Sequence, residues 1–166
     1  MQPWMSDNDK FTILKYLNQD DVMLEWGAGG STLCFPQFVK EYYSIEHDKD
    51  WYNQILHEPT IAYNFTIFLC EPNALRTLPT QKHQFEDYIN YISKIDKKFD
   101  KILIDGRARQ WCAEKALNYL TEDGIVFIHD WIRERYHTIL EWYTVIEETQ
   151  ADQYDANGLA VLQKKC

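Results

Sequence analysis

Apolar positions along the chain fall into two patterns, which are short continuous runs and stretches with helical spacing. The continuous runs predict buried β-strands, because each is short and stops at a polar residue. They lie at 22–24, 42–45, 65–70, 99–104 and 125–128. Two further β-prone runs, at 143–148 and 159–163, predict a terminal hairpin.

Stretches with apolar residues three and four positions apart lie between these runs and predict helices. The first carries Phe11, Leu14 and Leu17 after N-cap candidates at 6–9, and we expect it to cover one edge of the sheet or a bound ligand. The other helices are predicted at 31–40, 49–57, 85–95, 111–120 and 132–143, with a loop at 75–83. Alternating strands and helices predict an α/β domain with helices on both faces. Its seven-stranded sheet is expected to be parallel apart from an antiparallel edge strand.

Length and composition limit the classes of partner. With 166 residues, 45% of them apolar and 15% aromatic, the chain 1–166 is expected to fold as one domain. Its net charge of −9 argues against nucleic acid, which selects basic surfaces. No apolar run approaches the roughly 18 residues of a membrane span, and the first ten residues lack the apolar core of a signal peptide. The four cysteines lack C-x-x-C spacing. Together these features predict a cytoplasmic protein without membrane contact.

A glycine-rich turn follows the first strand and contains Glu25, Gly27, Ala28, Gly29, Gly30, Ser31 and Thr32. Glycine permits positive φ and lets a ligand approach the main chain, and the N–H groups at the start of the next helix face that ligand. The dinucleotide pattern G-x-G-x-x-G is absent, because Thr32 occupies its third glycine position. The acid before the turn, Glu25, suits a positively charged ligand.

A second acid, Glu46, ends the second predicted strand, 21 residues after Glu25. Ligands of doubly wound folds lie across the carboxyl ends of adjacent strands, and an acid in this place accepts the ribose hydroxyls. The alternative is that Glu46, His47 and Asp48 only cap the helix that follows. Asp48 is the better N-cap, so the spacing favours a ligand role for Glu46.

A cluster of ionisable residues is expected where two further strands end. One strand runs into Asp105, Gly106 and Arg107, and the next runs into His129 and Asp130. If these strands are neighbours, their end residues converge. Asp105 or His129 could then act as a general base, or Asp105 and Asp130 could hold a divalent cation such as Mg²⁺ or Mn²⁺. Arg107 and Arg109 could instead neutralise the carboxylates without a metal.

Taken together, these segments resemble the class I S-adenosylmethionine-dependent methyltransferases, which have a Rossmann-like sheet. The resemblance covers nearly the whole chain. It implies that the glycine turn wraps the methionine part of S-adenosylmethionine, with Glu25 near its ammonium group and Glu46 on its ribose. It also places His47 near the adenine and ribose and Asn73 beside the adenine. The cofactor residues implied are Glu25, Gly27, Ala28, Gly29, Gly30, Ser31, Thr32, Glu46, His47, Asn73, Asp105 and Gly106.

The acid pair Asp105 and Asp130 also resembles that of metal-dependent small-molecule O-methyltransferases, although these more often carry an oxygen ligand where this chain has His129. More narrowly, the chain is similar to the small C-terminal methyltransferase domain of a chlorovirus multidomain protein that builds capsid glycans. That resemblance implies O-methylation of a terminal rhamnose, a domain cut from a longer polypeptide, and residence in the host cytoplasm. We expect Arg107, Trp131 and Arg133 to contact the acceptor, with Trp111 and Tyr136 as further candidates.

Two other functions compete with the methyltransferase hypothesis. One is a nucleotide-dependent oxidoreductase or epimerase, against which the missing third glycine counts. The other is a non-catalytic binding domain with the same fold, against which the intact Asp105, His129 and Glu46 count. A homodimer is left open.

Overall fold

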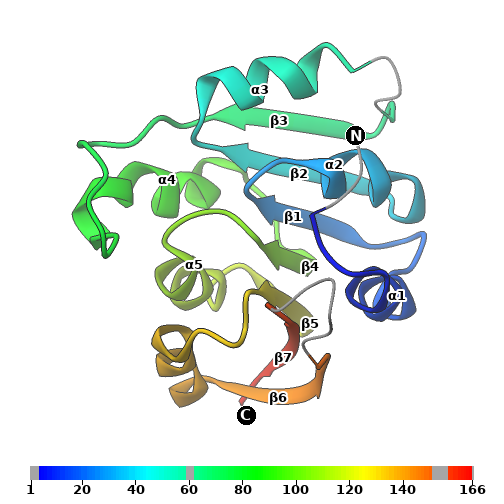
Figure 1. Cartoon of the computed structure of the whole chain (residues 1–166). Coiled ribbons are helices and arrows are strands. Elements are labelled where there is room, and N and C mark those ends of the chain that lie inside the picture. Colours follow the sequence, from blue (N-terminus) through cyan, green and yellow to red (C-terminus); the bar gives the residue numbers. More distant parts are fainter. Residues whose placement is uncertain (1–3, 59–61, 151–156, 166) are drawn as a thin grey trace.

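The computed structural model describes residues 4–58, 62–150 and 157–165 (Figure 1). A seven-stranded sheet with strand order β3-β2-β1-β4-β5-β7-β6 forms its centre. The strands are β1 Val22–Trp26, β2 Glu41–Glu46, β3 Phe65–Leu69, β4 Phe99–Ile104, β5 Leu120–His129, β6 Tyr143–Glu148 and β7 Leu159–Lys164. Neighbouring strands in the series β3-β2-β1-β4-β5 pair in parallel, whereas β7 pairs antiparallel with both β5 and β6. The predicted α/β fold, with a sheet that is parallel apart from an antiparallel strand near one edge, is confirmed, and that strand is β7, which lies between β5 and the outermost strand β6.

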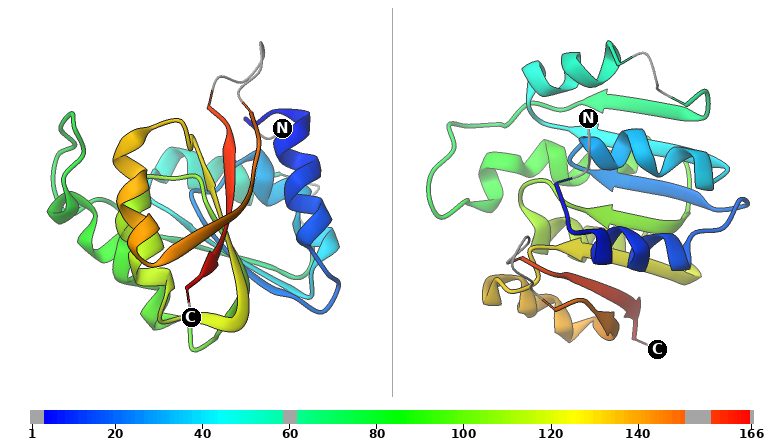
Figure 2. Two further views of the ribbon diagram at one scale, coloured as in Figure 1. Left: turned by 90° about the horizontal axis from the view of Figure 1, so that it is seen from below. Right: turned by 45° about the vertical axis from the view of Figure 1, so that its right-hand side comes forward.

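Helices cover both faces of the sheet, as predicted (Figure 2). Helices α1 (Asp7–Tyr16) and α2 (Gly30–Cys34) pack on one face, and α3 (Lys49–Leu56) lies beside β2 and β3. Helices α4 (Glu86–Asn90) and α5 (Arg109–Ala116), with the 3-10 helix η4 (Glu134–Glu141), cover the other face. Because side chains alternate along β1, Met23 joins the core under α1 and Leu24 joins the core under α5. Short 3-10 helices η1 (Pro36–Phe38), η2 (Lys82–Phe85) and η3 (Tyr91–Lys94) complete the layers.

Several predicted helices are shorter in the structure. The helix after β1 ends at Cys34 instead of near residue 40, because Pro36 cannot donate a backbone hydrogen bond and begins the 3-10 helix η1. The helix predicted at 111–120 is α5, which ends at Ala116, and the strand predicted at 125–128 is the longer β5, which already begins at Leu120. The predicted helix at 132–143 is the shorter 3-10 helix η4.

Helix α1 begins at the predicted N-cap, where the Ser6 hydroxyl accepts from the Asp9 N–H at 3.0 Å. Its buried face differs from the one that apolar spacing predicts. Phe11 is 71% exposed, whereas Ile13 is fully buried against the sheet and Asp9 is 1% exposed. The helix therefore presents a carboxylate to the interior. No described helix is long and apolar enough to cross a bilayer.

Strand β1 lies between β2 and β4: strands β2 and β3 are added on one side of β1, and β4 and β5 on the other. The order of the strands therefore reverses at β1. Gly27 takes a φ of +95° there, and a Cβ at this position would lie 2.5 Å from both N and Cα of Gly106. The turns after β1 and β4 thus touch backbone to backbone. Folds of this kind place their ligand in the crevice at such a switch point.

Candidate active site

A cavity of about 660 Å³ opens at the carboxyl ends of β1, β2, β4 and β5. Its walls include predicted site residues from four separate turns, which are Gly27, Ala28, Gly29, Gly30, Ser31, Glu46, His47, Asp105, Gly106, Arg107, His129, Asp130 and Arg133. The volume lies within the range of small-molecule sites, which is roughly 300–1,000 Å³. The structure therefore brings most of the predicted residues to one crevice.

Glu25 lies beneath the glycine turn and is not part of the cavity wall. Its carboxylate is fully buried and accepts hydrogen bonds from the hydroxyls of Ser31, Thr32 and Ser44, the last two at 2.6 and 3.0 Å. Burial raises the pKa of this carboxyl to about 7, although the three hydroxyls oppose that shift. Glu25 thus fixes the start of α2 from below, as does Thr32, whose side chain is also buried outside the wall.

Glu46 joins the turn after β1 to the turn after β2. Its Oε2 accepts the Ala28 N–H at 2.7 Å, and its Oε1 accepts the N–H groups of His47 and Asp48 at 2.8 and 2.7 Å. Asp48 caps α3 through the N–H groups of Asp50 and Trp51, so the capping role belongs to Asp48 and not to Glu46. The buried Glu46 carboxylate is left at the cavity wall.

Asn73 lies away from the cavity. It is exposed, and its side chain exchanges hydrogen bonds with Asp87, at 2.7 Å to the carboxylate and 2.9 Å from the backbone N–H. These bonds tie the segment after β3 to the start of α4. The predicted contact of Asn73 with a cofactor has no geometric support here.

The ends of β4 and β5 form a buried charge cluster around Arg109. The Arg109 guanidinium lies 3.1 Å from Asp105 Oδ1 and 3.0 Å from Asp130 Oδ2, and it donates to the His129 carbonyl at 2.6 Å. Its Nε donates to the Gly106 carbonyl at 2.9 Å. One arginine therefore holds the two turns and both carboxylates in place.

His129 bridges the sheet and the first helix. Its Nδ1 lies 3.0 Å from Asp105 Oδ1, and its Nε2 lies 3.6 Å from Asp9 Oδ2. Burial of this ring alone would lower its pKa, but the two carboxylates outweigh burial and raise the pKa to about 10. Asp9 in turn has its pKa lowered to about 2 by His129 and Thr149, against the effect of burial. At neutral pH His129 is an imidazolium without a free lone pair, so Asp105 is the better base.

Asp9 is a site residue that the sequence pattern does not reveal. An acid in the first turn of a helix is ordinarily explained by the helix dipole. The signal that could have found it is the stripe Met5, Asp9, Thr12 and Ile13, which follows one helical face and is buried throughout.

Replacing Asp9 by Asn should destabilise the fold by about 3 kcal/mol near pH 6, because a buried imidazolium loses one of the two carboxylates that raise its pKa. The loss should be full between the ordinary pKa values of 3.8 for Asp9 and 6.5 for His129. It should vanish as pH falls through about 2 and as pH rises through about 10, the pKa values of the two groups in the folded protein. Urea unfolding at a series of pH values measures this difference.

Asp7→Asn is the matched control on the same helix, since the Asp7 side chain is 84% exposed and its one ion pair with a described residue is with Lys10 at the surface. It should change the unfolding free energy by no more than about 0.5 kcal/mol. Equal effects of the two substitutions would contradict the buried pair.

The predicted divalent cation does not fit this arrangement. Arg109 lies between the carboxylates of Asp105 and Asp130, and Arg133 adds a second contact to Asp130 Oδ2 at 3.0 Å. A cation shared by these carboxylates would have to displace a guanidinium. Within the described ranges, no group of three or more His, Cys, Asp or Glu side chains is placed to hold a metal ion.

The predicted acceptor contacts divide into two sets. Arg107 and Arg133 line the cavity, whereas Trp131 is buried and donates its indole N–H to Glu148 at 3.2 Å. Trp111 and Tyr136 pack with the core on the α5 face. The aromatic side chains that do line the cavity are Trp4 and Trp51, with ring centroids 5.8 Å apart, and sequence spacing does not single them out.

No family model and no curated protein matches this sequence. Solved structures do match its fold. A methyltransferase-like protein from Silicibacter pomeroyi matches with a TM-score of 0.66 at 19% identity, over 97% of this chain and 87% of that chain. The N-methyltransferase NodS from Bradyrhizobium japonicum, solved with S-adenosyl-L-homocysteine, gives 0.65 at 16%, over 98% and 88%. An rRNA methylase from Streptococcus thermophilus gives 0.65 at 15%, over 95% and 93%. The Rossmann-like fold of class I methyltransferases is therefore confirmed.

Proposed function

We propose that the protein is an S-adenosylmethionine-dependent methyltransferase. The observation that carries this proposal is the carboxylate of Glu46 at the wall of the cavity, one strand away from the glycine turn and opposite Asp105. The similarity to methyltransferase structures, one of them solved with S-adenosyl-L-homocysteine, supports the fold that this proposal needs.

The cavity has the chemistry that this cofactor requires. The Oε2 atom of Glu46 accepts the Ala28 N–H and keeps a lone pair that suits a ribose hydroxyl, and the turn at Gly27, Ala28 and Gly29 brings main chain to the cavity surface. Asp48, Asp50 and Asp105 add negative charge to the walls, which suits an ammonium and a sulfonium. Glu25 acts indirectly in this proposal, because it shapes the turn from beneath.

S-adenosylmethionine, when bound, would supply a methyl group carried on a positively charged sulfur. Once the methyl group is transferred, that sulfur is a neutral thioether. The carboxylate of Asp105 takes the proton of the acceptor hydroxyl as the new carbon–oxygen bond forms. Arg109 and the His129 imidazolium fix the position of that carboxylate from two sides. Asp130 holds Arg109 in turn. The chain thus supplies alignment and one base.

For the acceptor we favour a sugar hydroxyl, with the terminal rhamnose of a glycan as the first candidate, or another small hydroxylated molecule. The narrower resemblance to a glycan-building viral domain supports this choice, and Trp4 and Trp51 at the cavity offer flat apolar surfaces to a sugar ring. Nucleic acid is disfavoured by the net charge of −9. We further propose a single cytoplasmic domain without membrane contact.

An acceptor screen tests this function. The protein is incubated with S-adenosylmethionine and with rhamnosides, other glycosides or a short RNA, and mass spectrometry detects an added methyl group. Methylation of a glycoside supports the proposal. Methylation of RNA alone would contradict the acceptor, and a protein that binds S-adenosyl-L-homocysteine but methylates nothing would favour the binding domain.

Removal of divalent metal should leave methyl transfer unchanged, because Arg109 and not a cation compensates the charge of Asp105 and Asp130. Rates before and after exhaustive treatment with EDTA test this expectation. Loss of activity that Mg²⁺ or Mn²⁺ restores would contradict it and would support a divalent cation held by Asp105 and Asp130.

A further inference from the structure

Arg107 differs from the other arginines at the cavity because it has no anionic partner among the residues that the structure describes. It follows β4, is half-buried and lines the cavity wall. Arg109 and Arg133 both contact carboxylates, whereas the Arg107 guanidinium makes no hydrogen bond or ion pair within the described ranges. The nearby carboxylates are already engaged, Asp105 by Arg109 and His129, and Asp130 by Arg109 and Arg133.

Further positive charge gathers around Arg107. Burial lowers the pKa of the Arg107 guanidinium, and the charges of Arg76, which lies in the loop before η2, of Arg109 and of Arg133 act in the same direction. Such an effect means that the charged form of Arg107 is disfavoured where it lies. Three arginines, Arg107, Arg109 and Arg133, line this cavity in a chain with a net charge of −9. A half-desolvated cation among like charges is costly unless an anion joins it.

We propose that Arg107 is the centre of an anion-binding subsite, and that the acceptor carries a phosphate or carboxylate group next to the hydroxyl that is methylated. This inference rests on the proposed methyltransferase function, whose acceptor class it narrows. The planar guanidinium presents paired N–H donors that match either anion. Arg133 supplies further charge at the same wall.

The location assigns the anion to the acceptor. Arg107 is two residues from Asp105, the proposed base. Glu46, whose carboxylate is proposed to bind the ribose, ends β2, and β1 separates β2 from β4 in the sheet. A group bound by Arg107 therefore lies at the end of the cavity where the proton is removed. A neutral terminal rhamnose would satisfy the subsite only through a phosphate or acidic sugar linked to it.

The competing explanation is that Arg107 binds the carboxylate of the cofactor. Two ligands separate these roles, because S-adenosyl-L-homocysteine carries that carboxylate and 5′-methylthioadenosine lacks it. If Arg107 served the cofactor, Arg107→Gln would weaken binding of the first ligand alone. The proposal predicts instead that Arg107→Gln leaves the affinity for both ligands unchanged.

The test is an NMR titration of arginine side-chain N–H signals in the full chain with inorganic phosphate and, separately, with acetate. Arg107→Gln should weaken binding of the preferred anion by about tenfold or more. Arg107→Lys should recover only part of it, because an ammonium is a point charge without the paired donors. The phosphate and acetate arms distinguish a phosphorylated from a carboxylated acceptor.

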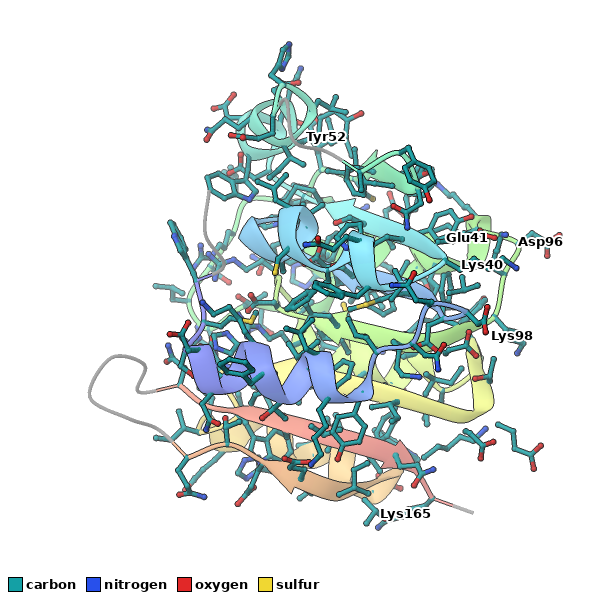
Figure 3. All side chains as sticks on the ribbon, turned by 90° about the vertical axis from the view of Figure 1, so that its right-hand side faces the viewer. Lys40, Glu41, Tyr52, Asp96, Lys98 and Lys165 are labelled. Atoms are coloured by element: carbon teal, nitrogen blue, oxygen red, sulfur yellow. The ribbon has the colours of Figure 1, made fainter. Side chains whose placement is uncertain are left out.

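Lys98→Gln is the charge-matched control. Lys98 precedes β4 at the end opposite Asp105, where Figure 3 shows it with Lys40, Glu41 and Asp96. It should leave anion binding unchanged. Equal anion binding by the wild type and Arg107→Gln would overturn the proposal. It would also be overturned if a short RNA bound more tightly than phosphate or acetate, in a salt-dependent manner, and lost that affinity in Arg107→Gln. Because the titrations need no cofactor, anion binding without any affinity for S-adenosyl-L-homocysteine would instead overturn the methyltransferase assignment.

Discussion

Replacing Asp105 by Asn should lower the turnover number for methyl transfer on the order of 10²- to 10⁴-fold, the range found when a general base is removed. Asn has nearly the same shape and still accepts a hydrogen bond from His129, but it cannot take the proton of the acceptor. The affinity for S-adenosyl-L-homocysteine should change little. Initial rates and calorimetry on the same preparation measure both quantities.

The control for this substitution is Asp96→Asn, which removes an exposed carboxylate at the opposite end of the sheet (Figure 3). It should retain wild-type turnover. Wild-type turnover in Asp105→Asn would remove the proposed base. A rate that rises only as pH approaches about 10, the pKa of His129, would transfer the role of base to that ring.

Replacing Gly27 by Ala should destabilise the protein by more than about 3 kcal/mol and abolish cofactor binding. Gly27 has a φ of +95°, which strains any residue with a Cβ. The new methyl would lie 2.5 Å from both N and Cα of Gly106, and neither backbone can move without shifting β1 or β4. Urea unfolding gives the stability, and calorimetry gives the affinity.

Gly29→Ala provides the comparison within the same turn. Gly29 has an extended backbone with φ of −175°, and a Cβ there would meet its nearest atoms at an ordinary 3.9 Å. Its unfolding free energy should stay within about 1 kcal/mol of the wild type. Similar stability of Gly27→Ala and Gly29→Ala would show that the close approach of the two turns is unimportant.

The sequence predicts the site well where parallel strands alone decide the geometry. Glu46 and His129 end buried strands and Asp105 directly follows one, and parallel strands with right-handed crossovers end on the same edge of the sheet. Their convergence on one cavity therefore needs no detail of packing. Asp48 was likewise predicted as the cap of α3 from local sequence, and the structure confirms it.

Tertiary packing decides the features that the sequence does not predict. The ionic contact of Asp9 with His129 depends on how α1 docks, and the apolar spacing of Phe11, Leu14 and Leu17 suggested a different buried face. Trp131 is predicted as an acceptor contact because a flat aromatic ring suits a sugar, but the backbone of Asp130 turns with a φ of +59° and Trp131 is buried. For the two carboxylates the sequence offers Arg107 and Arg109 as the alternative to a metal, and the pairing of β4 with β5 decides that Arg109 is the one that contacts both.

Calorimetric titration with S-adenosyl-L-homocysteine and with NAD tests the central claim most directly. The account predicts that the wild type binds S-adenosyl-L-homocysteine more tightly than NAD. It also predicts that Glu46→Gln, which loses a charge-assisted contact to the ribose, binds S-adenosyl-L-homocysteine about tenfold more weakly. Tighter binding of NAD, or an undiminished affinity for S-adenosyl-L-homocysteine in Glu46→Gln, would contradict it.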